Sequence, residues 1–210
     1  MGRVPSGNDE KMLKAGVALA KARGLNGYTV REVCARSKVN LGMFHYYFGS
    51  KDNFDRAVLK KIYSVMMERI NISISPSGAP RDNVRGVLVK ILEFVKENRV
   101  LLSSLGGDVL SGNRKTLKFI ADNFTKHVEI LYGELKRAQD RGELKGASAS
   151  DAILFLMPSI VLPQILLGLL CRLKVNLSFK IKAAGLGLAV DRGALRRIDM
   201  MIDAIFGEEK

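Results

Sequence analysis

The sequence predicts an all-α protein built from about nine helices. Apolar residues recur at three- and four-residue spacing along almost the whole 210-residue chain, which is the period of an amphipathic helix. No segment shows the sustained alternation and hairpin turns that are typical of β-strands. Hydrophobic residues make up 47% of the chain, so it has enough apolar surface to build a core, and a disordered protein is excluded.

Four helices are expected in the first 72 residues. The first begins at residue 8 or 9, runs to residue 23 and stops at Gly24. Thr29 is followed by Glu32 at the spacing of a capping box, which predicts the start of a short second helix. Asn40 is the expected N-cap of a short third helix that ends near residue 46. Ser50 caps a longer fourth helix that continues toward residue 70.

A turn-rich segment at residues 73–80 separates these helices from the rest of the chain. Beyond it, the apolar spacing predicts helices at about residues 81–98, 100–110, 114–141, 150–173 and 191–206. Residues 111–113 and 142–149 are expected to be loops, and residues 176–190 give the weakest signal.

The charge of the chain is strongly positive and unevenly distributed. The formal net charge is +13, which indicates an acidic partner, nucleic acid first and a membrane surface second. Residues 1–69 carry 13 Lys and Arg against six Asp and Glu, so this third of the chain is about twice as positive per residue as the remainder. Such a distribution is typical of a small DNA-binding domain on a more neutral body.

The second and third helices are short, capped and about four residues apart, which is the spacing of a helix-turn-helix motif. In this motif the second helix enters the major groove with its first residues at the base edges. The candidates for that face are small, polar or aromatic and none is acidic: Asn40, Gly42, Met43, His45 and Tyr46. Lys51 follows at the start of the fourth helix, where a lysine and free backbone N–H groups can hold a phosphate.

The region contains the pattern Val39-Asn40-x-Gly42-x-Phe44-x-x-Tyr47-Phe48-x-x-Lys51, together with Thr29, Val33, Ala35 and Phe54. By this pattern, roughly residues 9–63 resemble the TetR family of bacterial regulators. The resemblance implies phosphate contacts by Thr29, Tyr46, Tyr47 and Lys51, and base-edge contacts by Asn40, Leu41, Gly42, Met43 and His45. The family usually has Ala-Gly in the turn, where this chain has Ser37-Lys38, so Lys38 is expected either to adopt a left-handed conformation or to alter the turn.

The resemblance also implies a domain organisation. We expect an N-terminal helix-turn-helix domain at residues 1–50, a connecting helix at about 51–72, and a C-terminal effector-binding and dimerisation domain at 73–210. The last two long helices would form the homodimer interface, through residues 152–170 and an apolar face made of Leu195, Ile198, Met201, Ile202, Ile205 and Phe206. Pocket candidates, each of which could instead be an ordinary core residue, are Phe94, Leu101, Leu105, Phe119, Phe124, His127, Leu131, Phe155, Met157 and Gln164.

The resemblance implies a repressor which binds a pseudo-palindromic double-stranded operator as a dimer and is released by a small apolar or amphipathic effector. The sequence leaves open an activator in place of a repressor and a corepressor in place of a releasing effector. An architectural or non-specific DNA-binding protein is the alternative, although the large apolar body argues against it.

No catalytic, cofactor or metal site is expected, because the chain has only two histidines and two isolated cysteines and no nucleophile or phosphate-loop motif. The start of the chain carries no signal-peptide pattern, which favours the cytoplasm. Residues 152–170 approach the length of a membrane span, but two prolines and a glutamine favour burial.

Overall fold

The structure is a computed structural model that describes residues 7–172 and 191–207. This part of the chain contains ten α-helices, one short 3-10 helix and no strand, so the predicted all-α class is confirmed. The helix predicted at 191–206 is present, whereas residues 176–190 lie outside the described residues.

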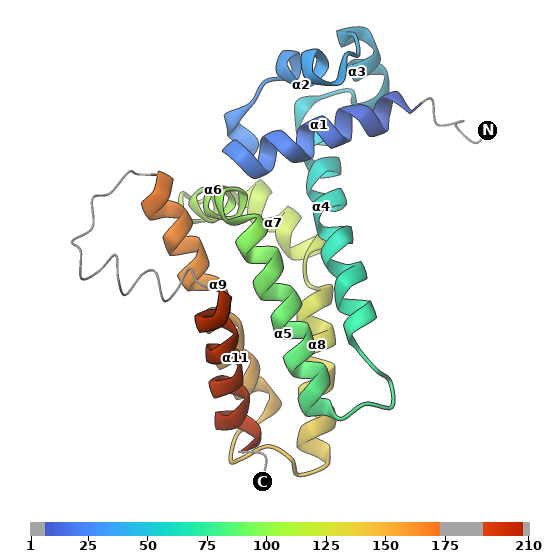
Figure 1. Ribbon diagram of the computed structural model, residues 1–210. Coiled ribbons are helices and arrows are strands. Elements are labelled where there is room, and N and C mark those ends of the chain that lie inside the picture. The colour runs from blue at the N-terminus through green and yellow to red at the C-terminus, as the bar shows by residue number, and fades with distance from the viewer. Residues whose placement is uncertain (1–6, 173–190, 208–210) are drawn as a thin grey trace.

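The N-terminal helices form a separate small layer at one end of the molecule, which we call the head (Figure 1). Its elements are α1 (Asn8–Arg23), η1 (Leu25–Gly27), α2 (Val30–Ser37) and α3 (Leu41–Phe48). Helix α4 (Lys51–Ser73) starts in the head and runs down along the body (Figure 1). The boundaries follow the predicted capping residues, because Thr29, Asn40 and Ser50 each accept a hydrogen bond from the backbone N–H three residues later.

The body is a bundle of long helices (Figure 1). It consists of α5 (Pro80–Glu97), α8 (Lys126–Asp140), α9 (Ala149–Arg172) and α11 (Asp191–Phe206), together with the lower part of α4. Two shorter helices, α6 (Arg99–Leu110) and α7 (Arg114–Asn123), lie between this bundle and the head (Figure 1). Helix α6 therefore touches both parts of the molecule, against α1 above and α9 below.

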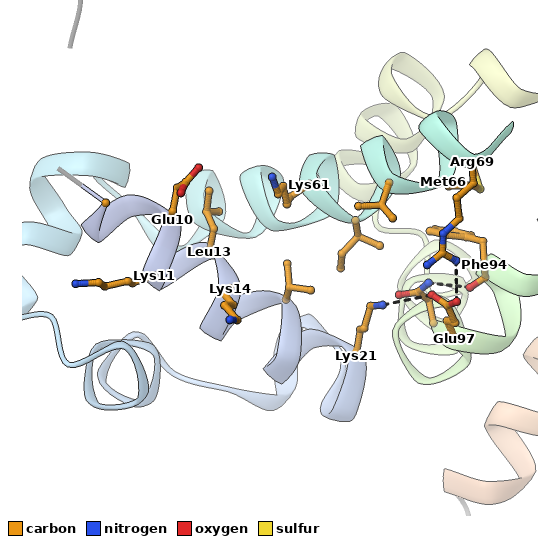
Figure 2. A pocket seen from close by; sticks show the side chains of 15 residues that line it. Glu10, Lys11, Leu13, Lys14, Lys21, Lys61, Met66, Arg69, Phe94 and Glu97 are labelled. Atoms are coloured by element: carbon orange, nitrogen blue, oxygen red, sulfur yellow. Dashed lines mark hydrogen bonds and ion pairs between the residues drawn. The ribbon is translucent and has the colours of Figure 1, made fainter. Parts of the chain in front are cut away.

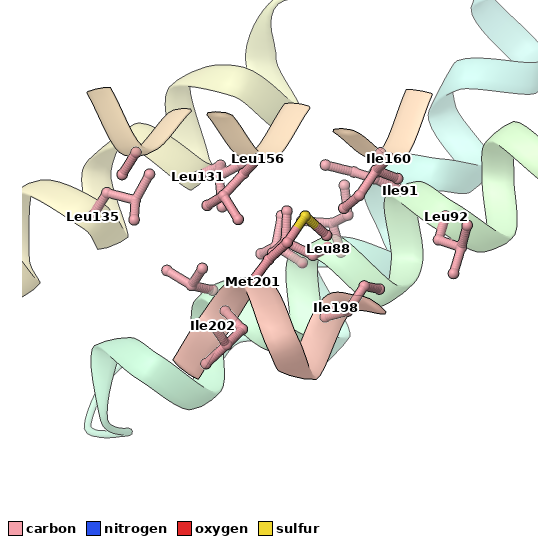
Figure 3. Close-up of a cluster of buried hydrophobic side chains, with 14 of the residues drawn as sticks. Leu88, Ile91, Leu92, Leu131, Leu135, Leu156, Ile160, Ile198, Met201 and Ile202 are labelled. Atoms are coloured by element: carbon pink, nitrogen blue, oxygen red, sulfur yellow. The ribbon is translucent and has the colours of Figure 1, made fainter. Parts of the chain in front are cut away.

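The core of the body forms around α5 (Figure 3). Its apolar residues recur at helical spacing and are buried along one continuous face, made of Val84, Val87, Leu88, Ile91, Leu92 and Val95. Leu131 and Leu135 of α8, Leu156 and Ile160 of α9, and Ile198 and Ile202 of α11 close over that face. Truncating a fully buried member such as Leu88 to alanine typically costs about 2–5 kcal/mol of stability.

The single helix predicted at residues 114–141 is wrong, because the structure divides it into α7 and α8. The break lies at Phe124 and Thr125, where Phe124 leaves the helical region with φ −126° and ψ 34°. Its ring then packs against Tyr63 of α4, with ring centroids 4.5 Å apart. The apolar periodicity continues across the break, so the helical pattern alone gives no warning of it.

The head has its own apolar core, and α6 contributes to it. Phe44 of α3 and Phe54 of α4 are fully buried at its centre, with ring centroids 5.1 Å apart. Gly16 allows α1 to cross α4 closely, since a Cβ atom there would lie 2.5 Å from the Phe54 ring. Leu101 and Leu105 of α6 are buried in the same cluster. The head is thus packed onto α6 as well as joined to the body by α4.

Candidate DNA-binding surface and effector cavity

Helix α3 places its predicted base-reading residues on one exposed surface. The Asn40 Oδ1 atom accepts a hydrogen bond of 2.8 Å from the Met43 N–H, which fixes the start of the helix. Phe44 points inward and anchors α3 to the head core. The exposed residues are Asn40, Leu41, Gly42, His45 and Tyr46, whereas Met43 and Tyr47 are half-buried. The helix therefore presents a surface without acidic groups at the outer end of the molecule.

The space beside the Cα atom of Gly42 could hold a side chain. A Cβ atom at this position would meet only the Asn40 Oδ1 atom, at 3.4 Å, which is ordinary contact. The backbone of Gly42 is ordinary α-helix, so no left-handed conformation requires glycine here. Nothing inside the described chain therefore explains a glycine within α3, where alanine would favour the helix by roughly 0.5–1 kcal/mol. A close approach by a molecule outside the chain would explain it.

The start of α2 and the following turn have the local geometry that the sequence predicts. Thr29 Oγ1 accepts the Glu32 N–H at 3.2 Å, and the Thr29 N–H donates to Glu32 Oε2 at 2.7 Å, so the capping box is complete. These backbone and side-chain hydrogen bonds lower the pKa of Glu32, with the Thr29 N–H as the main cause and Arg23 as a further one. Lys38 adopts φ 56° and ψ 38°, the left-handed conformation expected where the resembling family has glycine.

Lys51 is part of a network inside the head. Its Nζ atom donates to the Leu25 carbonyl at 2.8 Å and to Asp55 Oδ2 at 2.6 Å, and it lies 4.5 Å from the centre of the Tyr28 ring. The Tyr28 hydroxyl donates to the other Asp55 oxygen at 2.5 Å. Burial raises the pKa of Asp55 and outweighs the hydrogen bonds from Lys51 and Tyr28, which lower it. The ammonium of Lys51 has three N–H donors, so one remains beyond these two hydrogen bonds.

A cavity of about 370 Å³ lies in the body below α6. Helices α4, α5, α6, α7, α8 and α9 all contribute to its lining, which is almost entirely apolar. Its volume is within the usual range for small-molecule sites. Six of the ten predicted pocket residues line it, namely Phe94, Leu101, Leu105, Phe124, His127 and Met157.

The other four predicted pocket residues lie elsewhere, which corrects those assignments. Leu131 is fully buried in the body core, and Gln164 is buried on α9, but neither lines the cavity. Phe119 borders a different depression, near Asp108 and Asn113. Phe155 is 48% exposed on the outside of α9. Sequence spacing places these residues on apolar helix faces but cannot say which neighbour each face meets.

Sequence reasoning also missed one wall of the cavity. This wall comes from α4, through Leu59, Ile62, Tyr63 and Met66. The four positions follow the spacing of a helix face, so the sequence signal for burial was present. The sequence could not show that this face continues past the head core and reaches the body.

Tyr63 and His127 form a polar pair at the cavity wall. The Tyr63 hydroxyl oxygen accepts the backbone N–H of His127 at 3.2 Å and lies 3.1 Å from His127 Nδ1. Burial lowers the pKa of His127 from 6.5 to about 4, so the imidazole is neutral at pH 7. The hydroxyl can then donate its own proton to Nδ1, an arrangement in which the imidazole proton is on Nε2. Tyr63 and His127 are the two polar side chains in an otherwise apolar lining.

Helix α6 connects the cavity to the head. Leu101 and Leu105 line the cavity and are also buried in the head core. Gly24, at the end of α1, packs closely on the same helix, since a Cβ atom there would lie 2.8 Å from both Ser104 Cβ and Ser104 Oγ. A shift of α6 caused by an occupant of the cavity would therefore be transmitted to α1 by direct contact.

One side of α9 is apolar and exposed. Its outward residues include Leu154, Phe155, Leu162 and Leu166, and Leu195 and Met200 of α11 are also exposed. The predicted dimer residues Ile198, Met201, Ile202 and Ile205 are instead buried against the protomer's own core, which corrects that assignment. Residues 149–166 are long and apolar enough to cross a membrane, with 28% of that window buried.

The comparisons with known proteins agree with this architecture. The sequence profile of the bacterial regulatory proteins of the tetR family matches residues 12–58. The HTH-type transcriptional repressor SCO4008 of Streptomyces coelicolor is 22% identical over 167 residues, which cover 77% of this chain and 83% of that protein.

Two solved structures share the fold over nearly the full length. A putative TetR-family transcriptional regulator from Rhodococcus sp. superposes with a TM-score of 0.72 at 16% identity, covering 96% of this chain and 100% of the other. The regulator FadR from Bacillus subtilis, in complex with stearoyl-CoA, superposes with a TM-score of 0.71 at 14% identity, covering 95% and 99%.

An exposed helix-turn-helix on a separate helical body defines a DNA-binding transcriptional regulator. Residues 12–58 thus match the DNA-binding domain of the TetR family, and the chain as a whole is similar to a transcriptional repressor and shares its fold with TetR-family regulators.

Proposed function

We propose that this protein is a repressor that binds a pseudo-palindromic operator as a homodimer and is released when a small, mainly apolar effector fills the cavity. The observation that carries the proposal is the position of α6, whose Leu101 and Leu105 belong both to the cavity wall and to the head core. An effector must change the head position through differential binding to two arrangements of the protein. By linkage, the operator and the effector then weaken each other's binding by the same factor.

DNA contacts are proposed for the surface of α3 and its flanks. Asn40, Leu41, Gly42, Met43 and His45 would face base edges, and Thr29, Tyr46, Tyr47 and Lys51 would contact phosphates. The exposure of most of these residues and the open space at Gly42 support this assignment. A twofold dimer would place two α3 helices about 34–36 Å apart, one turn of DNA. Operator DNA binding also makes the cytoplasm the expected compartment.

The dimer is proposed to form through the exposed apolar side of α9, together with Leu195 and Met200 of α11. In soluble proteins, a contiguous exposed apolar surface marks a site of interaction with another molecule. Within the described part of α9, Pro158 and Pro163 interrupt the helix hydrogen bonds, and Ser103 Oγ of α6 donates to the Ile165 carbonyl at 2.9 Å. Because α9 is hydrogen-bonded to α6, we favour a helix that belongs to the bundle and packs against a partner protomer. A membrane-spanning helix is the less favoured alternative.

The effector is proposed to have an apolar body and one hydrogen-bond acceptor. The cavity lining provides apolar contact, and the Nε2–H of His127 would bind a carbonyl, hydroxyl or carboxylate oxygen. The likeness of fold to FadR, which holds stearoyl-CoA, supports a ligand with an alkyl chain. We also propose domain boundaries that separate DNA binding from effector binding. They are 1–50 for the head, 51–72 for the connecting helix and 73–210 for the body.

Two adjacent glycines in α6 provide a test with a matched control. Gly106 lines the cavity and Gly107 does not, and a Cβ atom at either would meet no other atom within 4 Å. Gly106→Leu should fill the cavity and abolish binding of a simple ketone such as 2-octanone by calorimetry, whereas Gly107→Leu should bind it as the parent protein does. Both variants should bind a twofold-symmetric site from the protein's own promoter region at least tenfold more tightly than random DNA.

The results that would contradict the proposal are distinct. Equal affinity for the symmetric site and random DNA would favour a non-specific or architectural DNA-binding protein. Equal binding of 2-octanone by the two glycine variants would show that the cavity is not the effector site. A stable monomer in light scattering would exclude the proposed α9 interface.

A further inference from the structure

A second recess lies outside the effector cavity, in the groove between α1 and α4 (Figure 2). It has a volume of about 660 Å³ and is partly open to solvent. One wall is the side of α1 that carries Leu13, Lys14, Val17 and Lys21, and the opposite wall is the side of α4 from Lys61 to Arg69. The end of α5 closes the groove with Phe94 and Glu97 (Figure 2). The groove thus lies across the junction of head and body.

The rim of this groove is basic. Five cationic side chains line it, namely Lys11, Lys14, Lys21, Lys61 and Arg69, against only two carboxylates, Glu10 and Glu97. Glu97 already pairs with Arg69 at 2.7 Å and with Lys21 at 3.7 Å, and these pairs close one end of the groove (Figure 2). Among the described residues, Lys11, Lys14 and Lys61 form no ion pair, so three ammonium groups remain to bind an anion.

The floor of the groove is apolar. It is formed by Val17, Ile62, Val65, Met66 and Phe94. Val65 is 41% exposed, so part of this apolar floor is accessible from the groove. An apolar floor under a cationic rim matches a molecule that has an alkyl chain and an anionic head, because each part then meets complementary chemistry.

A buried hydrogen-bond acceptor lies at the closed end of the groove. Asn98 is 1% exposed and lines the groove, and its Oδ1 atom has no hydrogen-bond partner in the described structure. Its Nδ2 atom is occupied, since it donates to the Phe94 carbonyl at 2.7 Å. An unpaired buried acceptor is costly, but it requires a donor, which neither an alkyl chain nor a carboxylate supplies. The basic rim and the apolar floor are therefore the features that match an amphipathic anion.

We propose that the α1–α4 groove binds an amphipathic anion, a single alkyl chain with a carboxylate or phosphate head. The chain lies over Val65, Met66 and Phe94, and the head group is held by Lys14 and Lys61 from opposite walls. This site is separate from the effector cavity, although Ile62, Met66 and Phe94 form the partition between the two. Because its walls belong to α1 of the head and to α4 and α5 of the body, an occupant would hold the head in one orientation.

Octyl phosphate is a suitable probe. Its controls are 1-octanol, which has the alkyl chain alone, and inorganic phosphate, which has the head group alone. The measurement is calorimetric titration of the full-length protein carrying Gly106→Leu, so that the inner cavity does not contribute. We expect one octyl phosphate to bind per protomer, at least tenfold more tightly than 1-octanol or inorganic phosphate. Its affinity should fall as the salt concentration is raised. Binding is measured without DNA, so its outcome is independent of the proposed repressor function.

Adjacent lysines of α4 supply the matched control. Lys61 lines the groove, whereas Lys60 borders a different depression on the other side of the helix. Lys61→Gln and Lys14→Gln should each lower octyl phosphate affinity about tenfold or more, and Lys60→Gln should leave it within twofold of the parent. Both groove lysines are exposed, so the variants should retain the helical circular dichroism and melting temperature of the parent.

Three results would overturn the proposal. The first is octyl phosphate binding no tighter than 1-octanol. The second is equal affinity in the Lys60→Gln and Lys61→Gln proteins. The third is an absence of octyl phosphate binding combined with weaker operator binding by Lys14→Gln and Lys61→Gln, which would assign these lysines to the DNA backbone instead.

Discussion

The ammonium group of Lys51 lies 2.6 Å from Asp55 Oδ2, one helical turn further along α4. The same nitrogen also donates a hydrogen bond to the Leu25 carbonyl, so Lys51 connects the start of α4 to the segment that follows α1. The lysine predicted to contact a DNA phosphate therefore has a second role inside the head. Its side chain is 31% exposed, which leaves its third donor accessible.

Lys51→Met is expected to weaken both the fold and the DNA contact. Removal of the ammonium leaves a partly buried carboxylate at Asp55, which should lower the free energy of unfolding by roughly 1–3 kcal/mol in urea denaturation. Loss of one phosphate contact should also reduce the slope of log K against log salt by about one. A less stable protein with an unchanged slope would restrict Lys51 to its structural role. Lys60→Gln, outside the head, should change neither quantity appreciably.

Gly42→Ala is expected to separate stability from DNA affinity. Alanine should stabilise α3 by about 0.5–1 kcal/mol, because a Cβ atom fits without a clash inside the protein. The added methyl group should nevertheless lower operator affinity tenfold or more, since it occupies the space proposed for the DNA. Fluorescence anisotropy with a labelled operator measures the affinity, and thermal melting measures the stability.

Gly133→Ala in α8 is the matched control for this change. Gly133 is also an exposed helical glycine with open space around its Cβ position, but it lies on α8, away from the head. It should gain similar stability with no change in operator affinity. If Gly42→Ala bound the operator as tightly as Gly133→Ala, the proposed close approach at α3 would be wrong.

Lys38→Gly is expected to stabilise the helix-turn-helix. Lys38 is the non-glycine residue with positive φ in the described structure, and a side chain in this conformation costs about 1–2 kcal/mol. Glycine removes that strain but adds entropy to the unfolded chain, so the net gain should be about 0.5–1 kcal/mol in urea denaturation. Lys38→Ala removes the same charge and keeps the strain, so it should give no gain. Equal stability of the two variants would contradict a strained turn.

The stability of the body should depend on pH through His127. Burial lowers the pKa of this imidazole from 6.5 to about 4, so between these values the unfolded chain binds a proton that the folded chain does not. The free energy of unfolding therefore falls as the pH drops through this window. Between pH 7.5 and pH 5 the contribution of His127 should be a loss of about 2 kcal/mol.

His127→Gln should remove this contribution. The variant is expected to be less stable than the parent at pH 7.5, because it loses the contact with Tyr63, but to lose about 2 kcal/mol less on transfer to pH 5. Urea denaturation at the two pH values measures both quantities. An equal loss in parent and variant would show that His127 is not the buried group responsible.

Local chemistry explains why the head could be predicted closely. The capping box of Thr29 and Glu32 and the caps at Asn40 and Ser50 are hydrogen bonds between residues three apart, so the sequence contains both partners within one helical turn. The left-handed conformation of Lys38 is one of the two alternatives that the family resemblance left open for this turn. These interactions need no information about distant parts of the chain.

The cavity, the groove and the break before α8 depend on contacts between residues far apart in the sequence. Tyr63 and His127 are 64 residues apart, and their hydrogen bond becomes possible only when α4 and α8 pack together. Likewise, Leu131 and Phe124 both occupy apolar positions, yet the packing of α4 and α5 puts one in the core and the other at the cavity. Periodicity identifies the face of a helix that is buried, but the neighbour that covers it is set by the packing of the whole bundle.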